Sequence, residues 1–353
     1  MNGLLLHEFH ASQGAHFMEI NGQEVVRDYG DWRREYEALN NAAALVDLSF
    51  RSRLCVLGAD AQKFLNGQVT NNLKDLKVGA GCYAALVSAK GKMQSDLNIY
   101  RLENEWLLDF EPGLGAAVKE RLEKFVVAED VQIVDVAASY GMLRVQGPKA
   151  AEIVAGVLKS APVKPMEIVA TQSEEFGEYY VAACAAGFDF FAPAESLARS
   201  AQALFNATGV LCGWQALETT RIENTIPRFG ADMDETNLPP EAGLENRAIS
   251  YAKGCYIGQE VIARIRTYGQ VAKALRGLEL SAKPEIPVKG DILFAGDKEA
   301  GYITSVTVSP RRKKVIALGY VRKEFFAIGT ELMIDPGGAK IPARVATLPF
   351  DPF

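Results

Sequence analysis

The sequence predicts an α+β protein in which two similar α+β units precede a small antiparallel β-barrel. Three observations support this prediction. The first two thirds of the chain contain an internal repeat, each copy of the repeat ends in a second helical pattern, and the last quarter consists of short strand-like runs. With 353 residues the chain exceeds what one hydrophobic core usually serves, so two or three domains are expected.

The internal repeat reads strand, turn and helix, followed each time by several strands and a second helix. Gly58 and Gly147 occupy the two turns and lie 89 positions apart. The second helices are predicted over residues 115–125 and 195–205, because apolar residues recur there at helical spacing. These apolar residues are Val118, Leu122 and Phe125 in one helix and Leu197, Ala201 and Leu204 in the other. The shared order of elements favours two units of similar build over a chance similarity.

The region after residue 272 is predicted to form the barrel. Short apolar runs are separated there by Gly, Pro and charged residues, which is typical of antiparallel strands joined by turns. The expected strands cover residues 275–280, 291–294, 300–308, 315–321, 331–334 and 343–346. The basic run 311–314 falls between two of them and is expected to be a solvated hairpin turn. The preceding segment 226–252 lacks periodicity and is expected to be rich in loops.

Composition and charge argue against several classes of protein. The net charge of −6 argues against binding to nucleic acid or to an anionic membrane. No apolar run approaches the ~20 residues that span a bilayer. The first 14 residues lack the pattern of a signal peptide. We therefore expect a cytoplasmic protein with no membrane and no nucleic-acid partner.

Cysteine and histidine are placed in a way that predicts no metal site. The five cysteines are widely spaced, odd in number and without a C-x-x-C pair: Cys55, Cys82, Cys184, Cys212 and Cys255. This pattern fits neither a disulfide framework nor a zinc or iron–sulfur ligand set, and it fits a reducing compartment. All histidines lie near the start, at His7, His10 and His16, so a His-based catalytic triad is not expected and structural roles are favoured.

Residues 253–260 carry the most informative motif, Lys-Gly-Cys-Tyr-Ile-Gly-Gln-Glu. Its two glycines permit backbone conformations with positive φ and the close approach of a ligand. The positive charge of Lys253 would favour the thiolate form of Cys255 and make it a better nucleophile. The alternative is an ordinary glycine turn with a small, half-buried cysteine. We define the signature loop as Lys253, Gly254, Cys255, Tyr256, Gly258, Gln259 and Glu260.

This motif resembles the K-G-C-Y-x-G-Q-E signature of the YgfZ family, folate-binding proteins that support iron–sulfur enzymes. Residues 64–70 and 88–93 resemble the L-x-G-Q-V-T and A-K-G-K-M segments of that family. Other segments resemble its parent family, the T-proteins (aminomethyltransferases) of the glycine cleavage system. These segments are residues 6–10, 46–49, 221–223, 316–321 and 329–330. The matches occur in the right order over nearly the whole chain.

The resemblance implies a T-protein-like ring of three domains around a central hole of folate size. The two α+β units would have antiparallel sheets, and the barrel would be C-terminal. The first α+β domain is expected to combine residues 1–50 with 137–240, and the second to cover 51–136. Residues 241–272 would hold the signature loop and a linker, and residues 273–353 the barrel.

Two aspartates are the expected folate-contacting acids. In the predicted strand 92–100, alternation puts Asp96, Asn98 and Tyr100 on one face. The resemblance places Asp96 beside the reacting nitrogen of tetrahydrofolate, where a carboxylate can orient an amine and stabilise positive charge. Asp189 replaces the glutamate of a T-protein G-F-E segment, and its carboxylate could accept two parallel N–H donors of a pterin. For both residues the alternative is a solvated position on a strand.

Three further residues are expected near folate by the same resemblance. Tyr83 could stack on the folate ring or belong to the core. Arg221 and Glu223 could contact folate or form a structural ion pair that holds the loop 226–229. T-proteins also carry Y-T-G-E before the G-F-E segment, whereas residues 181–186 here read V-A-A-C-A-A. The residues that a T-protein uses for its amine-donor site are therefore not all present in this sequence.

The sequence thus predicts a tetrahydrofolate-binding protein of the YgfZ type that supports iron–sulfur cluster assembly or repair. Asp96 and Cys255 are the predicted catalytic residues. The predicted folate-binding residues are Tyr83, Asp96, Asp189, Arg221 and Glu223. Reduced folate, as tetrahydrofolate or a one-carbon derivative, is the expected ligand, and iron–sulfur client proteins are expected partners. The alternative is a T-protein-like aminomethyltransferase that transfers a one-carbon unit to tetrahydrofolate, and a third reading is a folate-binding module without turnover.

Overall fold

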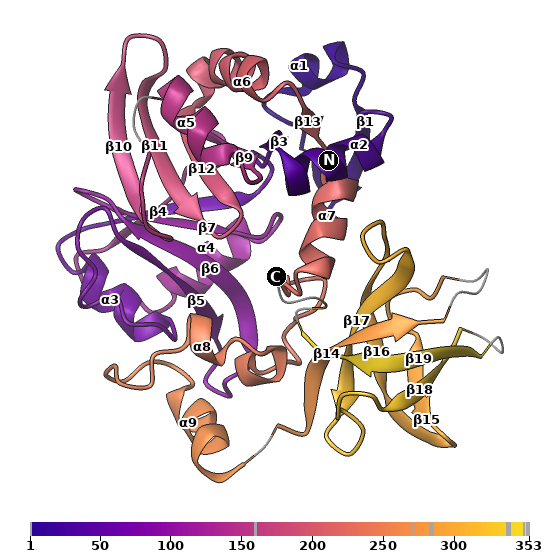
Figure 1. Cartoon of the computed structure of the whole chain (residues 1–353). Helices are drawn as coiled ribbons and strands as arrows, with labels where there is room; N and C mark the ends of the chain where they lie inside the picture. The colour runs from indigo at the N-terminus through magenta and orange to yellow at the C-terminus, as the bar shows by residue number, and fades with distance from the viewer. Residues whose placement is uncertain are drawn as a thin grey trace. The chain divides into compact units, whose positions relative to one another are not determined.

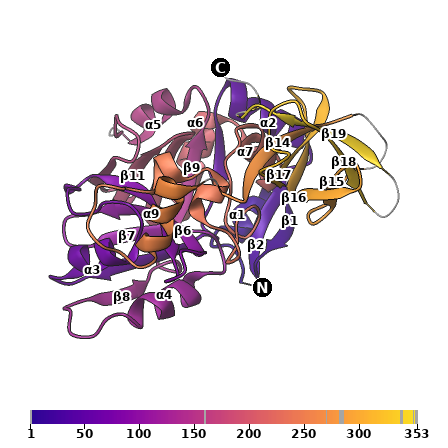
Figure 2. The same cartoon turned by 90° about the horizontal axis from the view of Figure 1, so that it is seen from below.

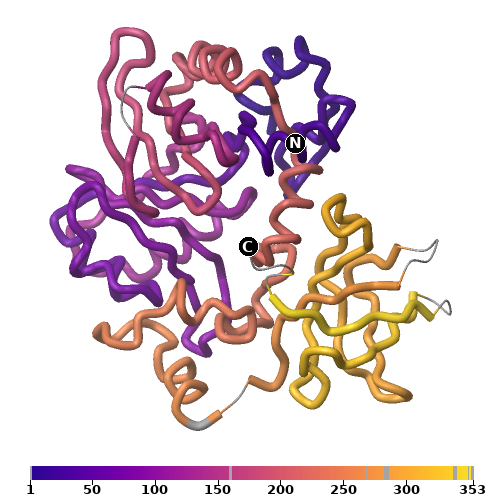
Figure 3. The backbone as a smooth tube through the Cα atoms, in the orientation of Figure 1, coloured from indigo at the N-terminus to yellow at the C-terminus, as the bar shows by residue number. Residues whose placement is uncertain are grey.

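The computed structural model describes residues 2–158, 161–269, 271–281, 286–336, 340–348 and 350. The chain forms two compact units, each made of two segments. Unit 1 comprises Met1–Ala84 and Ser95–Leu217, and unit 2 comprises Ala85–Gln94 and Glu218–Phe353. The backbone trace can be followed by residue number in Figure 3.

Unit 1 contains a six-stranded sheet with the order β10-β11-β12-β9-β3-β13 (Figure 1). Its strands are β3 (Ala44–Asp47), β9 (Tyr140–Gln146), β10 (Ile168–Ser173), β11 (Gly177–Cys184), β12 (Gly187–Pro193) and β13 (Leu211–Cys212). Neighbours are antiparallel, except that β13 runs parallel to β3. Helices α5 (Ala150–Leu158) and α6 (Ala194–Thr208) pack on this sheet and bury Val154 and Leu204 against Phe190.

A five-stranded sheet with the order β5-β6-β7-β4-β8 contains the other copy of the repeat. Its strands are β4 (Ser52–Leu57), β5 (Gly81–Val87), β6 (Met93–Arg101), β7 (Trp106–Phe110) and β8 (Gln132–Asp135). Helix α3 (Ala61–Gln68) follows β4, and α4 (Gly115–Glu123) follows β7. The pairs β6–β7, β7–β4 and β4–β8 are antiparallel. The predicted helices over 115–125 and 195–205 are present as α4 and α6.

The N-terminal part of unit 1 adds two helices and a hairpin to these sheets. Its elements are α1 (His7–Ser12), β1 (His16–Ile20), β2 (Gln23–Asp28) and α2 (Trp32–Asn41). Helix α2 begins after Asp31, whose side chain accepts a hydrogen bond from the backbone N–H of Arg34 and so caps the helix. The three histidines lie in this part, and each hydrogen-bonds to a carboxylate: His7 to Glu24, His10 to Asp47 and His16 to Asp28.

A buried arginine links the two sheets of unit 1. Arg53 lies on β4 with 0% of its surface exposed. Its guanidinium donates to the carbonyl oxygens of Ser49, Ala137 and Tyr140 at 2.9, 3.1 and 3.1 Å. Burial lowers the pKa of Arg53 to about 10, so the group remains charged at neutral pH. A β4 side chain thereby fixes the chain where it enters β9.

The two repeat glycines avoid the same kind of steric clash with the backbone. Gly58 has φ +109° and Gly147 has φ +128°, conformations that residues with a side chain rarely adopt. A Cβ on Gly58 would lie 2.0 Å from the carbonyl oxygen of Asp130, and one on Gly147 would lie 2.5 Å from that of Ala42. In both copies the strand can turn into the helix only because no side chain is present.

Unit 2 contains a closed six-stranded barrel with the order β14-β17-β16-β15-β18-β19 (Figures 1 and 2). Its strands are β14 (Lys273–Leu280), β15 (Ile292–Ala295), β16 (Lys298–Ser309), β17 (Lys314–Arg322), β18 (Glu331–Asp335) and β19 (Ile341–Ala346). Apolar side chains such as Leu278, Leu293 and Ile334 fill its interior. The predicted fold class, two α+β units with largely antiparallel sheets followed by a C-terminal β-barrel, is confirmed.

The remaining elements of unit 2 are helical. They are η1 (Pro239–Ala242), α8 (Glu245–Ala248) and α9 (Gln259–Tyr268), and α7 (Trp214–Glu223) spans the boundary between the units. The segment 226–252 is mostly loop, as predicted, with two short helices in it. The basic run 311–314 does form the β16–β17 turn, but Arg312 is not merely solvated, because it bonds to Glu279 and to the carbonyl oxygen of Phe350.

The predicted domain boundaries and the arrangement of three domains around a central hole stay predictions. Within the described residues, no helix combines the length and apolar character needed to cross a membrane.

We expect Gly147→Ala to lower the free energy of unfolding by about 2–4 kcal/mol, since it adds both a positive-φ strain and a backbone clash. The measurement is urea unfolding followed by circular dichroism. Gly156→Ala is the matched control: Gly156 lies in α5 with nothing within 4 Å of an added Cβ. This control should raise stability by about 0.5–1 kcal/mol. Equal effects of the two substitutions would contradict the steric account.

Candidate functional site

Strand β6 carries the first predicted site residue on its more polar face. Burial alternates along the strand: Met93, Ser95 and Leu97 are fully buried, whereas Asp96 and Asn98 are partly exposed. This alternation confirms the predicted orientation of the strand. Tyr100 shares the face with Asp96 by position but is buried, with its ring 6.3 Å from that of Phe191.

Only one of the two carboxylate oxygens of Asp96 has a hydrogen-bond partner among the described residues. The hydroxyl of Tyr83, on β5, donates to Oδ2 of Asp96 at 2.8 Å. Oδ1 of Asp96 is buried and has no hydrogen-bond partner in the part of the chain that the structure describes. Burial and the charge of Glu111 raise the pKa of Asp96 to about 6, although Tyr83 and Arg51 act against this. The carboxyl group can therefore change protonation state close to neutral pH.

An ion-pair network lies next to Asp96 in unit 1. Arg51 donates to both carboxylate oxygens of Asp109, at 2.9 and 3.0 Å, and to Glu111 at 2.8 Å. Asn98 donates to Asp109 at 3.1 Å from the neighbouring strand β6. Asp109 and Glu111 are almost fully buried, so their charges need this pairing. The network fixes two acidic groups beside the carboxylate of Asp96.

Asp189 is engaged in a bidentate ion pair with Arg144. Arg144 lies directly across from Asp189 on the neighbouring strand, and its Nε and Nη2 donate to the two carboxylate oxygens at 2.6 and 2.9 Å. Asp189 is 1% exposed and is therefore not the solvated strand residue considered as the alternative. Burial raises the pKa of nearby Cys184, although the charge of Arg144 opposes that shift.

Together these groups form one cluster, which we name the unit 1 polar cluster: Arg51, Tyr83, Asp96, Asp109, Glu111, Arg144 and Asp189. Its charged members act on one another electrostatically, since Arg51 lowers the pKa of Asp96 and Asp109 raises that of Arg144. Arg51, Asp109, Glu111 and Arg144 were not predicted from the sequence. Alternation through Asp109, on β7, and Glu111, directly after it, could have shown these two acids as a pair, but nothing in the sequence indicates which arginines they meet.

Arg221 uses every one of its hydrogen-bond donors inside unit 2. Nε donates to Glu218 at 2.8 Å, Nη1 to the carbonyl oxygen of Ile226 at 3.1 Å and Nη2 to Ser305 at 2.7 Å. The remaining two N–H groups bond to Asp232 and to Glu218. A guanidinium has five N–H donors, so none is left for a ligand. Contact of Arg221 with folate stays a prediction that this saturation disfavours.

The predicted ion pair between Arg221 and Glu223 is wrong. Residues two apart on a helix point in different directions, and both lie in α7. Glu223 instead accepts a hydrogen bond from Ser309, at the end of β16. The predicted effect on the loop is nevertheless present, because Arg221 bonds to Ile226.

The signature loop leads into α9 and packs on the turn of residues 88–91. Gly258 caps the helix with φ +83°, and a Cβ there would lie 2.5 Å from the carbonyl oxygen of Ser88. Gly91, at the other side of this contact, has φ +70°. Both glycines permit positive φ, and Gly258 adopts it whereas Gly254 does not. The two motifs that resemble YgfZ proteins thus contact each other within unit 2.

The charged side chains of the signature loop have partners of their own. Lys253 is only 8% exposed, and its Nζ lies 5.1 Å from the ring centre of Tyr256, a cation–π contact. Gln259 is the first residue of α9, and Glu260 pairs with Arg264 one turn later, at 2.8 Å. Cys255 is exposed. Whether its thiol takes part in catalysis stays a prediction.

The other cysteines are less accessible. Cys55 and Cys212 are buried, and burial raises the pKa of both thiols. Among the described residues, no group of three or more His, Cys, Asp or Glu side chains is placed to hold a metal ion.

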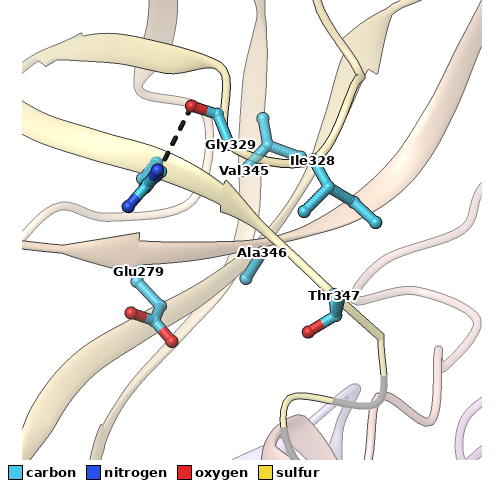
Figure 4. A pocket seen from close by; sticks show the side chains of 7 residues that line it. Glu279, Ile328, Gly329, Val345, Ala346 and Thr347 are labelled. Atoms are coloured by element: carbon cyan, nitrogen blue, oxygen red, sulfur yellow. Dashed lines mark hydrogen bonds between the residues drawn. The ribbon is translucent and has the colours of Figure 1, made fainter.

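A shallow hollow of about 220 Å³ lies on the barrel, lined by Glu279, Ile328, Gly329, Arg344, Val345, Ala346 and Thr347 (Figure 4). Glu279 is already paired with Arg312 and Lys314, and Arg344 bonds to the carbonyl oxygen of Gly329. It contains none of the predicted site residues and is not a candidate for the chemistry of this protein.

Comparison with known proteins assigns the two sheets and the closed barrel to a family. Residues 6–253 match the GCVT N-terminal domain, and residues 273–351 match the glycine cleavage T-protein C-terminal barrel domain. The chain therefore belongs to the glycine cleavage T-protein family.

Relatives cover the chain from end to end. An aminomethyltransferase of Symbiobacterium thermophilum is 29% identical over 372 residues, which cover 98% of this chain and 96% of the relative. One from Geobacillus kaustophilus is 29% identical over 361 residues, with 98% and 97% covered. The crystal structure of glycine cleavage system aminomethyltransferase T from Bartonella henselae matches with a TM-score of 0.90 and 24% identity, covering 99% of this chain and 98% of that one. The last comparison shows a shared fold.

These matches overturn the predicted role in iron–sulfur cluster assembly or repair. The relatives are named aminomethyltransferases, and nothing in the comparisons supports iron–sulfur client proteins as partners. The prediction gave eight residues of one loop more weight than a similarity that runs through the whole chain. The alternative named with it, a T-protein-like aminomethyltransferase, agrees better with the relatives.

We expect Arg221→Lys to lower the free energy of unfolding by about 2–3 kcal/mol, because lysine keeps the charge but has three donors instead of five and cannot bond at once to Glu218, Asp232, Ser305 and Ile226. Chemical denaturation gives the measurement. The control is Arg322→Lys, since Arg322 pairs with Glu299 at 2.7 Å on an exposed part of the barrel. It should change stability by less than about 1 kcal/mol. A mild effect of Arg221→Lys would show that its five bonds are not needed.

We expect Cys255 to react with iodoacetamide faster than the other four thiols in the folded protein, because it alone is exposed among them. Timed labelling followed by mass spectrometry of peptides ranks the five cysteines, and Cys55 and Cys212 should react last. The same order in urea would attribute the ranking to local sequence, so the denatured protein is the control. Labelling of Cys212 at the rate of Cys255 would refute the prediction.

Proposed function

We propose that this protein is an aminomethyltransferase that moves a one-carbon unit from a lipoylated carrier protein to tetrahydrofolate, with Asp96 as the catalytic carboxylate. One observation carries the proposal beyond family membership. Oδ1 of Asp96 is buried without a partner among the described residues, while Tyr83 occupies Oδ2. Buried carboxylate oxygens need donors, and the amine N–H groups of a reduced folate are donors of the right kind.

The unit 1 polar cluster suits this role. Tetrahydrofolate, when bound, supplies two amine nitrogens that together take up the transferred carbon. In the balanced exchange, the carbon–sulfur and carbon–nitrogen bonds of an S-aminomethyl carrier break and two carbon–nitrogen bonds to folate form. Ammonia and the carrier thiol leave with the two folate amine protons. Ionised Asp96 would orient one amine through Oδ1 and accept its proton, which is general base catalysis.

The groups around Asp96 set its pKa and its orientation for this step. Glu111 raises the pKa of Asp96, and Arg51, which binds Glu111, limits that effect. A pKa of about 6 lets Asp96 be mostly ionised at neutral pH and still bind a proton during turnover. Tyr83 would keep the carboxylate in one orientation through its bond to Oδ2.

We propose different roles for the other predicted folate-binding residues. Each oxygen of Asp189 accepts one N–H from Arg144 and retains a second lone pair, so contact with the pterin remains part of the proposal. Arg221 and Glu223 are better suited to hold α7 and its loop in position than to contact folate directly. Cys255 is the accessible thiol of the signature loop and is kept as a candidate catalytic residue.

We further propose that the chain belongs to the YgfZ-type branch of the superfamily, on the strength of residues 253–260. No iron–sulfur role is part of this assignment. Residues 181–186 differ from the Y-T-G-E of T-proteins, which favours a changed amine-donor site. A folate-binding protein without turnover is therefore the second candidate function.

We expect Asp96→Asn to lower the rate of methylene-tetrahydrofolate formation at least about 100-fold, because the amide cannot accept a proton. The assay mixes the enzyme with tetrahydrofolate and aminomethylated, lipoylated carrier protein. In the unsubstituted enzyme the rate should rise with pH through about 6 as Asp96 ionises. Glu111→Gln should move this rise to lower pH, since it removes a charge that raises the pKa of Asp96.

Two controls accompany this test. One is the stability of Asp96→Asn, and the other is a substitution of a distant aspartate, Asp297. The pKa of Asp96 is raised in the folded state, so its ionisation costs folding free energy above pH 6. Asp96→Asn should consequently be at least as stable as the unsubstituted protein at pH 8. Asp297→Asn, an exposed change on the barrel, should leave the rate within about twofold. Saturable binding of tetrahydrofolate with no transfer from the carrier would favour the second candidate function.

A further inference from the structure

We propose that a polar hollow in unit 2 binds an amino acid with an aliphatic side chain, which goes beyond the proposed transfer reaction. The hollow has a volume of about 470 Å³ and is lined by Glu245, Asn246, Ile249, Tyr251 and Arg266. These residues come from α8, from the segment that follows it and from α9. The volume lies in the range of small-molecule sites, roughly 300–1,000 Å³.

Arg266 supplies the group that would bind the carboxylate of the ligand. Its guanidinium carbon lies 4.1 Å from the ring centre of Tyr251, so the flat cation is stacked on the aromatic ring. Stacking fixes the plane of the guanidinium and leaves its N–H groups at the edge. No carboxylate of the described chain forms an ion pair with Arg266. A planar donor fork held in this way is suited to a carboxylate.

Glu245 supplies the group that would bind the ammonium of the ligand. Its side chain is partly buried, and burial alone raises its pKa. No lysine, arginine or histidine in the described ranges pairs with it. A partly desolvated carboxylate without a cation is stabilised when an ammonium group arrives.

The decisive point is that Glu245 and Arg266 line the same hollow without bonding to each other. Opposite charges that are close enough normally pair within 4.0 Å, and these two do not. A ligand with a carboxylate and an ammonium, bound in this hollow, would give each of the two charges a partner at once. The amide of Asn246 can donate to the carboxylate or accept from the ammonium.

Ile249 and the ring of Tyr251 form the apolar part of the lining and favour an aliphatic ligand side chain. Ile249 is the aliphatic residue of the lining and is 8% exposed. Because little of Ile249 is exposed, an aliphatic side chain on the ligand would rest mainly on the edge of the partly exposed Tyr251 ring, with a gain of about 25 cal/mol per Å² of apolar surface. A charged side chain would find no further partner among the lining residues.

Three matched probes test the proposal on the full-length protein by isothermal titration calorimetry. L-Leucine carries both charges, 4-methylpentanoate lacks the ammonium, and 3-methylbutylamine lacks the carboxylate. L-Leucine should bind saturably, and each of the other two should bind at least about 10-fold more weakly, because each loses one charge-assisted contact. Equal binding of the three probes, or no saturation by L-leucine below about 10 mM, would overturn the proposal.

Two substitutions in α9 provide the sharper comparison. Arg266→Gln should weaken L-leucine binding about 10- to 100-fold. Arg264→Gln removes an exposed arginine from the same helix, one that pairs with Glu260 instead, and should leave binding within about twofold. Equal losses in both variants would attribute binding to the general charge of the helix and would refute the site.

Glu245→Gln tests the other end of the ligand. It should weaken L-leucine as strongly as Arg266→Gln does and leave 4-methylpentanoate unaffected, since that probe has no ammonium. A parallel loss for both probes would contradict the assigned role of Glu245. None of these measurements uses folate or the carrier protein, so a failure of the proposed transferase activity and a failure of this site can be distinguished.

Discussion

The charge balance of the unit 1 polar cluster is the constraint on which the rest of the candidate site depends. Four carboxylates, Asp96, Asp109, Glu111 and Asp189, share two guanidinium groups, and Arg51 and Arg144 each bind at least one of them in bidentate geometry. Asp96 is the carboxylate that receives no guanidinium. Burial is the largest cause of its raised pKa, and the charge of Glu111 adds to it. The sheets must hold the other three acids in place so that the unpaired charge falls on Asp96.

The cluster also explains why the two sheets of unit 1 need arginines at their junction. Arg51 and Arg53 are two positions apart, with Arg53 within β4, and they serve opposite purposes. Arg51 neutralises side chains, whereas Arg53 is completely buried and binds only backbone carbonyl oxygens. One guanidinium sets the electrostatics of the site, and the other fixes the backbone on which the site is built. A hydrophobic residue in place of Arg53 would leave three carbonyl oxygens without their donor.

Much of the fold could be predicted from the sequence, because its signals are local. Helical spacing at Val118 and Leu122, the glycine turns at Gly58 and Gly147 and the short apolar runs of the barrel all depend on neighbours in the chain. The site was predicted in part: the alternation around Asp96 indicated its face, but Arg51, Asp109, Glu111 and Arg144 were missed because their pairing joins distant segments. The pairing of Arg221 was predicted with the wrong acid for the same reason, since Asp232 and Ser305 reach it through the tertiary structure. The predicted iron–sulfur role was wrong because it relied on the resemblance of one loop, residues 253–260, instead of the similarity along the whole chain.

The contact between Gly258 and the turn of residues 88–91 limits how this protein can evolve. Two motifs far apart in sequence meet there backbone to backbone, with Gly91 on one side and Gly258 on the other. A side chain gained at Gly258 would lie 2.5 Å from the carbonyl oxygen of Ser88, and one gained at Gly91 would crowd the side chain of Val261 at 3.2 Å and need a positive φ. An isolated mutation at either glycine is therefore penalised even when the other motif is intact. Each of these two segments therefore restricts the substitutions that the other can accept. A lineage that keeps one motif is under physical pressure to keep the other, whatever chemistry the loop performs.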